Sequence, residues 1–129
     1  MEDKIRLLQF FVCERFQSQK RDGYLVEGAR SNLYVPDFPH ALNYLHAVTC
    51  WRKDNRFHKE VIEYNSEDGA AIRSPHMDIE PVKGNIIFRW HTHRFPNDLI
   101  IQKPTTLWIK VILDWEVCFE SYLLIEKNP

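Results

Sequence analysis

The feature that most constrains the fold is a hairpin-like segment in the last third of the chain. Residues 107–113 are apolar at every position except Lys110, and Asp114-Trp115 separates them from a second strand-like run over residues 116–125. Two such runs joined by a turn-capable dipeptide predict a β-hairpin. Because the first arm is apolar on both faces, it is either a central covered strand or a strand whose outer face meets a partner.

Turn signals divide the rest of the chain into further short strands. Two are expected over residues 7–16 and 24–35, with a polar loop ending at Asp22-Gly23 between them and a bulge at Gly28. Pro39 is expected to open one short helical turn over residues 40–44. The proline-bearing segment 74–85 is expected to be irregular. Further strands are expected over residues 45–53, 57–64, 70–73, 86–95 and 99–102.

This spacing of short strands predicts the fold class. About seven to nine strands with turns every ~8–12 residues indicate an all-β, antiparallel two-sheet β-sandwich, immunoglobulin-like or related, with at most one short helix. The 129 residues are expected to form one domain, 1–129, and the 44% of hydrophobic residues is enough for a packed core. The predicted core contains Phe10 or Phe11, Val48, Phe88, Ile109, Val111, Phe119 and Leu123.

Composition argues against several classes of partner and location. The chain has 17 basic and 18 acidic residues, so it lacks the basic excess that is typical of nucleic-acid binders. No apolar run approaches the ~20 residues of a membrane span, and the acidic start does not resemble a secretory signal. We therefore expect a cytoplasmic protein with no nucleic-acid or membrane partner. Its three cysteines, Cys13, Cys50 and Cys118, are expected to be reduced core thiols.

The order of these signals resembles an uncharacterised family of small bacterial β-sandwich domains. The similar features are turns and core positions across most of the chain: Val12-Cys13-Glu14, Asp22-Gly23-Tyr24-Leu25, Gly28, Val35-Pro36-Asp37-Phe38-Pro39-His40, Glu67-Asp68-Gly69, and the hairpin turning at Asp114-Trp115-Glu116 and ending on Leu123-Leu124-Ile125. The chain departs from the family's pattern at Lys103-Pro104-Thr105-Thr106, where such domains carry a Gly-Tyr pair. The resemblance implies a sandwich fold and implies no activity.

His91-Thr92-His93 is the best candidate for metal binding. On a strand, His91 and His93 share one face, so both imidazoles can approach one ion, with His76, Asp78 or Asp98 as a further ligand. The neighbouring residues favour another interpretation. Ile86, Phe88 and Trp90 would form the apolar face, which leaves the histidines beside Arg89 on the outer face. We therefore expect a solvent-facing or interface histidine pair.

Other chemistry has less support in the sequence. A calcium site from Asp78, Glu80 and Asp98 on neighbouring loops is a further alternative. There is no Gly-x-Ser-x-Gly elbow, phosphate-binding glycine loop or Cys-x-x-Cys pair. We expect no catalytic residue and no cofactor.

The aromatic content points to an interaction surface. The outer face of residues 107–113 carries Trp108 and Ile112, with Lys110 between them. Two large apolar side chains on an outer face are typical of self-association or partner binding, unless a loop of the same chain covers them. We expect a non-enzymatic protein-interaction or assembly module, a homodimer or a protein with another protein partner. The alternatives are a small-ligand-binding domain and a metal-dependent enzyme that uses His91 and His93.

Overall fold

The computed structural model describes residues 4–19, 23–67, 69 and 71–129, so the turn positions Asp22 and Asp68 lie outside the described residues. Within this part the chain is all-β, with thirteen strands and no helix. The strands are β1 (Arg6–Cys13), β2 (Arg15–Gln19), β3 (Gly23–Glu27), β4 (Asn32–Val35), β5 (His40–Ala41), β6 (His46–Arg52), β7 (His58–Asn65), β8 (Ile72–Arg73), β9 (Met77–Ile79), β10 (Phe88–Arg94), β11 (Ile100–Ile101), β12 (Thr105–Leu113) and β13 (Glu116–Lys127).

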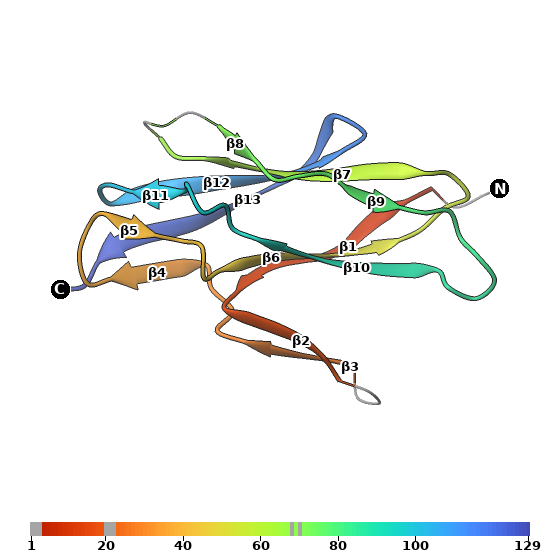
Figure 1. Cartoon of the computed structure of the whole chain (residues 1–129), viewed down its shortest axis with the longest axis horizontal. Helices are drawn as coiled ribbons and strands as arrows, with labels where there is room; N and C mark the ends of the chain where they lie inside the picture. The colour runs from red at the N-terminus through yellow and green to blue at the C-terminus, as the bar shows by residue number, and fades with distance from the viewer. Residues whose placement is uncertain (1–3, 20–22, 68, 70) are drawn as a thin grey trace.

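Two principal sheets share one core (Figure 1). β1, β6 and β10 form an antiparallel three-stranded sheet with β6 in the middle. The larger sheet has the order β4-β13-β12-β7-β8, with β9 also paired to β7, and it curls into a half-barrel. Buried side chains from both sheets form one cluster, which includes Trp51 from β6 and Ile62, Ile109 and Leu123 from the larger sheet.

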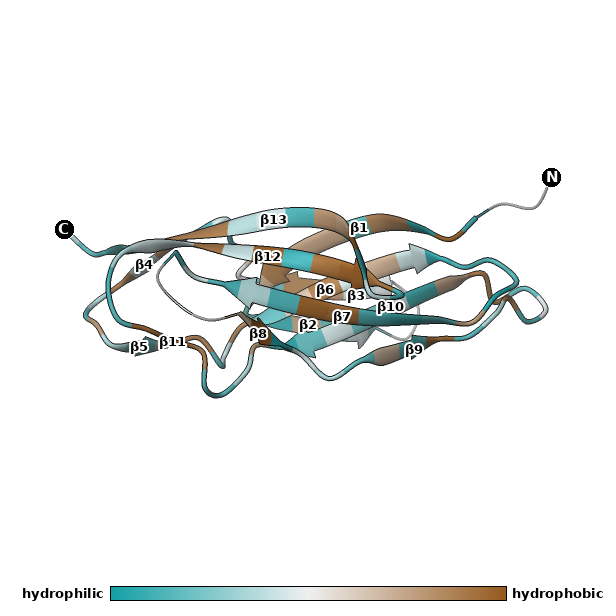
Figure 2. Cartoon of the chain, turned by 90° about the horizontal axis from the view of Figure 1, so that it is seen from above, coloured by the Kyte–Doolittle hydropathy of each residue, from teal (hydrophilic) through white to brown (hydrophobic). Residues whose placement is uncertain are grey.

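The predicted hairpin is confirmed as β12 and β13. β12 is hydrogen-bonded to β13 on one side and to β7 on the other, so it is a central strand. Its inward residues Leu107, Ile109 and Val111 have no solvent exposure. Figure 2 shows the apolar segments of β7 and β12 lying side by side in the body of the molecule. This covered position explains why the arm is apolar on both faces.

The turn between β12 and β13 holds two residues in a left-handed conformation. Asp114 has φ 50° and Trp115 has φ 69°, as a tight type I′ hairpin turn requires. The start of β7 supports this turn: the Asp114 amide donates to the Lys59 carbonyl at 2.9 Å, and the Lys59 amide donates to the Asp114 carboxylate at 2.9 Å. These bonds hold Asp114 in place, whereas Trp115 is 64% exposed.

The two long N-terminal strands that the sequence predicts are each divided in the structure. Residues 7–16 form β1 and β2, which separate at Glu14, and residues 24–35 form β3 and β4, which separate after Gly28. Gly28 is not a bulge within a strand: it has φ 65°, and a Cβ there would lie 2.8 Å from the Glu14 carboxylate. The left-handed backbone favours glycine here, and it directs the chain out of the β2–β3 hairpin, whereas the Glu14 side chain is exposed and could move aside.

The β2–β3 hairpin projects from the body of the molecule next to the three-stranded sheet (Figure 1). Its Phe16 and Tyr24 stack on each other with ring centroids 4.8 Å apart. Both also contact Trp90 of β10, at 5.5 Å and 4.7 Å. The outer face of β10 is therefore covered by aromatic rings of this hairpin.

Three other sequence predictions need correction. Residues 40–44 contain no helical turn, because His40 and Ala41 form β5 and pair with β11. The segment 74–85 is not wholly irregular, since β9 pairs with the start of β7. The thirteen strands exceed the expected seven to nine, because divided strands and two-residue strands such as β5, β8 and β11 add to the total within the described residues.

The predicted core is correct where it falls on central strands. Val48, Ile109, Val111 and Leu123 are buried. Phe10 and Phe11 are half-buried. The prediction is wrong for Phe88, which is 51% exposed at the end of β10, and for Phe119, which is 40% exposed beside β1.

Replacing Trp115 with glycine is expected to stabilise the protein. A non-glycine residue with left-handed φ costs roughly 1–2 kcal/mol, and glycine removes that cost while the exposed indole contributes little burial. Trp115→Gly should raise the free energy of unfolding by about 1 kcal/mol in urea titrations. Trp115→Ala is the matched control: it removes the same side chain and retains the strain. Equal effects of the two variants would show that the backbone conformation is not the cause.

Candidate functional site

Glu60 is a fully buried carboxylate in the centre of the molecule. It lies on β7 with 0% exposure, and the alternation of the strand places it on the same face as Ile62 and Tyr64, which point into the core. A buried carboxylate is costly unless several donors satisfy it. The hydrogen-bond donors around Glu60 therefore determine whether it is ionised.

Three nitrogen atoms from the three-stranded sheet converge on this carboxylate. His91 Nδ1 lies 2.8 Å and His93 Nε2 lies 2.5 Å from Glu60 Oε1. The indole Nε1 of Trp51 donates to the other oxygen, Oε2. The two histidines stand at i and i+2 on β10, and their side chains are no more than 3% exposed. The site thus joins β6 and β10 of one sheet to β7 of the other.

The donors keep Glu60 ionised. Burial by itself raises the pKa of this carboxyl, but the hydrogen bonds from His91 and His93 outweigh it and lower the pKa to about 2. The charge affects a neighbour on the same strand: burial raises the pKa of the Tyr64 hydroxyl, and the negative Glu60 raises it further. The centre of the core therefore carries a fixed negative charge.

The histidine pair does not face solvent, so that prediction is wrong. His91 and His93 point inward, while Phe88 and Trp90 lie on the outer face of β10. The two faces of β10 are therefore exchanged relative to the prediction, for two reasons. The aromatic rings of the β2–β3 hairpin cover Trp90, and the Glu60 carboxylate accepts hydrogen bonds from the buried imidazoles. Of the third ligands considered from sequence, His76, Asp78 and Asp98 are all exposed and lie outside the cluster.

A polar cavity reaches the cluster from outside. It has a volume of about 360 Å³ and is lined by Lys53, Met77, Asp78, Glu80, Arg89 and His91. Arg89 Nε donates to His91 Nε2 at 3.1 Å, which is the imidazole nitrogen that does not face Glu60. The predicted calcium candidates Asp78 and Glu80 both line this cavity, and Asp98 does not.

A third histidine, His58, links chain segments near the β12–β13 turn. His58 Nδ1 lies 2.6 Å from the Asp114 carboxylate, and His58 Nε2 lies 2.8 Å from the Asp54 carboxylate. Burial opposes a charge on His58, but the bonds to Asp114 and Asp54 outweigh it and raise the pKa of the imidazole. An imidazolium here bonds to both carboxylates at once, so the clamp holds together three segments of the chain.

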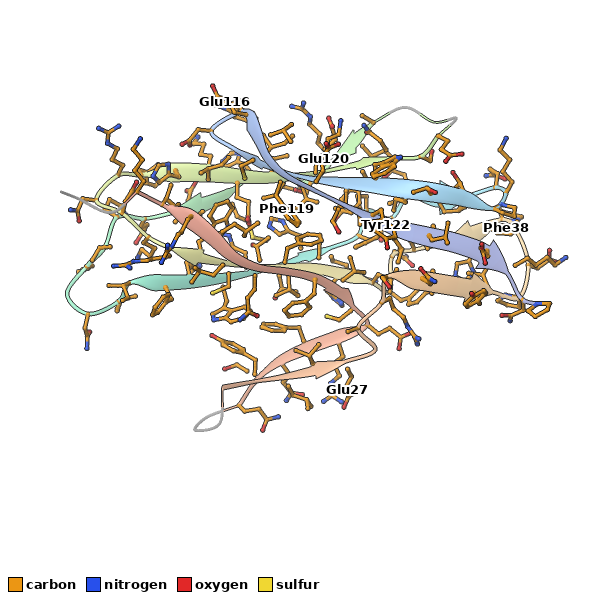
Figure 3. The ribbon with its side chains drawn as sticks, turned by 180° about the vertical axis from the view of Figure 1, so that it is seen from behind. Glu27, Phe38, Glu116, Phe119, Glu120 and Tyr122 are labelled. Atoms are coloured by element: carbon orange, nitrogen blue, oxygen red, sulfur yellow. The ribbon has the colours of Figure 1, made fainter. Side chains whose placement is uncertain are left out.

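The opposite side of the molecule is open between two strand edges. In the described part of the chain, residues 6–11 of β1 and residues 116–122 of β13 each pair with a strand on one side only. An apolar groove of about 430 Å³ lies between them, and its walls include Leu7, Phe10, Trp51, Leu113 and Phe119. Figure 3 shows Phe119 on β13 facing β1 across this space, with Glu116 at the tip of the hairpin. We call this region the open edge.

The surface predicted around Trp108 is smaller than the sequence suggests. Trp108 is 44% exposed and lies against Tyr122, with ring centroids 6.4 Å apart. Lys110 is half-buried, 3.8 Å from Glu120 and 4.0 Å from Glu63. Ile112 is only 1% exposed, so its predicted place on an outer surface is wrong. The exposed apolar area on this face therefore comes from Trp108 and Tyr122.

The cysteines divide into two classes. Cys13 and Cys50 are buried free thiols, as expected, and burial raises the pKa of both. Cys118 is exposed, so its predicted core position is wrong. It sits at the irregularity of β13 where the strand register shifts, its thiol donates to the Val111 carbonyl at 3.4 Å, and it lines the groove at the open edge.

The sequence matches no protein family and no curated protein. The resemblance to small bacterial β-sandwich domains therefore stays a prediction. The described residues include no helical segment with the length and apolarity of a membrane span.

The charge on Glu60 is expected to be essential for stability. Glu60→Gln removes the charge and replaces one carboxylate oxygen with an amide N–H₂ that faces donors, either Trp51 or the two histidines, so the free energy of unfolding should fall by about 3–5 kcal/mol. Glu27→Gln is the control, because Glu27 is an exposed carboxylate that pairs with the exposed Arg15 at 3.5 Å. That variant should lose at most ~1 kcal/mol. Equal losses in urea titrations of the two variants would contradict this role of Glu60.

The His58 clamp is expected to make stability depend on pH. The pKa of His58 is raised on folding, so its contribution is fully present below the unfolded-state value and is lost as pH rises through the folded-state value. At pH ~5.5, His58→Gln should lower the free energy of unfolding by about 1.5–3 kcal/mol, and at pH ~9 by clearly less. The exposed His76 provides the control, since His76→Gln should show no such difference. A loss from His58→Gln that is the same at both pH values would contradict the clamp.

Proposed function

We propose that this chain is a non-enzymatic self-assembly module that pairs with a second copy of itself along the open edge. The observation that supports the proposal is the apolar groove between two strand edges that have no further strand paired to them in the described residues. Unpaired strand edges present rows of N–H and C=O groups that template pairing with another chain. An apolar groove between two such edges adds side-chain burial to that pairing.

The charges on the rims of the groove favour a second copy as the occupant. The β1 rim carries Arg6, and the β13 rim carries Glu116 at the tip of the hairpin, and both residues are exposed. A two-fold axis can bring the basic rim of each copy against the acidic rim of the other. Such an isologous contact is self-complementary, as a C2 dimer requires.

The exposed apolar residues near the groove favour the same interface. Phe119 is 40% exposed, Val117 53% and Leu8 41%, and all three lie on or beside the two free edges. Tyr122 extends the apolar surface to Trp108, the residue that the sequence singles out. The interface would therefore continue from the groove onto the predicted surface.

The proposal also includes the type of sandwich, the family to which the chain is similar and its cellular location. Because both sheets contribute to one core and the β1 side is left open, the architecture is best described as a two-sheet sandwich of immunoglobulin-like type that is open along one side. Kinship with small bacterial β-sandwich domains agrees with this description. A cytoplasmic location and the lack of a nucleic-acid or membrane partner remain predictions.

A charge swap across the open edge tests the dimer. Arg6→Glu and Glu116→Arg should each weaken dimerisation about tenfold, because each places like charges across the interface. The double variant should restore it, since the pair is then complementary again with reversed signs. Sedimentation equilibrium over a series of protein concentrations measures the dissociation constant of each variant.

Trp108→Glu separates the open edge from the neighbouring outer face. It should weaken the dimer less than either rim variant does, because Trp108 lies outside the groove. A parent protein that stays monomeric at all concentrations would rule out self-assembly. A dimer that Trp108→Glu disrupts and the rim variants do not would move the interface to the outer face of β12.

A further inference from the structure

We propose that Glu60, His91 and His93 bind one divalent transition-metal ion such as Zn²⁺. This site is independent of the self-assembly proposal. One carboxylate oxygen and one nitrogen of each imidazole lie within 4.8 Å of one another, and all three residues are buried. Two imidazoles and a carboxylate are a common set of protein ligands for zinc and iron. The ligand atoms are His91 Nδ1, His93 Nε2 and Glu60 Oε1.

The backbone holds the three ligands on rigid elements. His91 and His93 pair with β6 in continuous antiparallel register, and Glu60 pairs with β12 on one side and β9 on the other. The second oxygen of Glu60 accepts the hydrogen bond from Trp51, which fixes the orientation of the carboxylate. Such outer hydrogen bonds are what orient metal ligands in known sites.

The hydrogen bonds of the cluster show how an ion can enter it. The ring nitrogens of both histidines lie 2.8 Å and 2.5 Å from the same oxygen, so their protons converge on one point. A divalent ion bound between the three ligand atoms takes the place of these protons, which move to the other nitrogen of each ring. The nitrogen–oxygen separations would then widen from 2.8 Å and 2.5 Å to roughly 3.3 Å, for bonds of ~2.0–2.1 Å in a tetrahedral site, so they change by about 0.5 Å and 0.8 Å.

Arg89 competes with the ion. Its Nε–H donates to His91 Nε2, so the proton of that imidazole stands on Nδ1, the nitrogen that the metal requires. When a metal binds His91 Nδ1, the proton of the ring moves to Nε2. Two donors, Nε2–H and the Nε–H of Arg89, would then face each other. Because Arg89 is exposed, its side chain can turn into solvent. This predicts that removing Arg89 strengthens metal binding.

The polar cavity reaches one of the three ligands. It runs from solvent to His91, and its lining carries the carboxylates of Asp78 and Glu80 together with the cationic side chains of Lys53 and Arg89. Three protein ligands leave a fourth position for water or a small ligand in a tetrahedral site.

Titration of chelator-treated full-length protein with Co²⁺ tests the site. The visible absorption of bound Co²⁺ should show one tetrahedral ion per chain, and competition with Zn²⁺ then gives the zinc affinity. His93→Gln should weaken zinc binding ~100-fold or more, because it removes a ligand. Arg89→Leu should strengthen it several-fold. This second variant changes an exposed side chain, so it remains informative if His93→Gln fails to fold.

A matched control excludes adventitious binding. His76 is exposed, lies 3.9 Å from Asp78 and is not part of the cavity lining, so His76→Gln should leave the zinc affinity within ~3-fold. Loss of binding in that control, with none in His93→Gln, would assign the ion to the surface. Absence of a tetrahedral Co²⁺ spectrum in both the parent and Arg89→Leu would overturn the proposal.

Discussion

The buried carboxylate of Glu60 is the interaction on which the rest of the structure depends. It comes from β7 of the larger sheet, and its donors Trp51, His91 and His93 come from β6 and β10 of the smaller one. A slip of one residue in either sheet would move the charge or its donors to the other face and leave a buried polar group without partners. The same slip would turn the apolar core residues toward solvent. We infer that this network and the apolar core together fix how the two sheets face each other.

Turning the histidines inward has a consequence on the other face of β10. Trp90 then points outward, and the β2–β3 hairpin supplies Phe16 and Tyr24 to cover it. The chain leaves the three-stranded sheet at Glu14, between β1 and β2, and it leaves the hairpin at Gly28, which adopts a left-handed conformation close to Glu14. The orientation of β10 therefore explains both features: its histidines join the polar network inside, and its outward Trp90 is covered by the aromatic hairpin.

The sequence predicts the central hairpin and most of the long strands, because their apolar runs and flanking turns are local signals. It fails on the face of β10, since both faces carry residues that can be buried: aromatic rings on one and compensated imidazoles on the other. Glu60 carried a usable signal, because it is in phase with the apolar residues Ile62 and Tyr64 on the same face of its strand. Its partners lie 9, 31 and 33 residues away in sequence, on strands that only the tertiary fold brings together. Two-residue strands such as β5 and β11 depend in the same way on a partner that the sequence does not reveal.

Trp51 connects the two regions to which function is assigned. Its indole N–H donates to Glu60, while its ring forms part of the wall of the groove at the open edge. The cluster of His91 and His93 lies toward β10, and the groove lies toward β1, on the two sides of the central strand β6. An ion on Oε1 of Glu60 would leave the Trp51 bond to Oε2 in place. Because Trp51 is 1% exposed and already bonded to Glu60, the buried site and the open edge share one ordered side chain of the core.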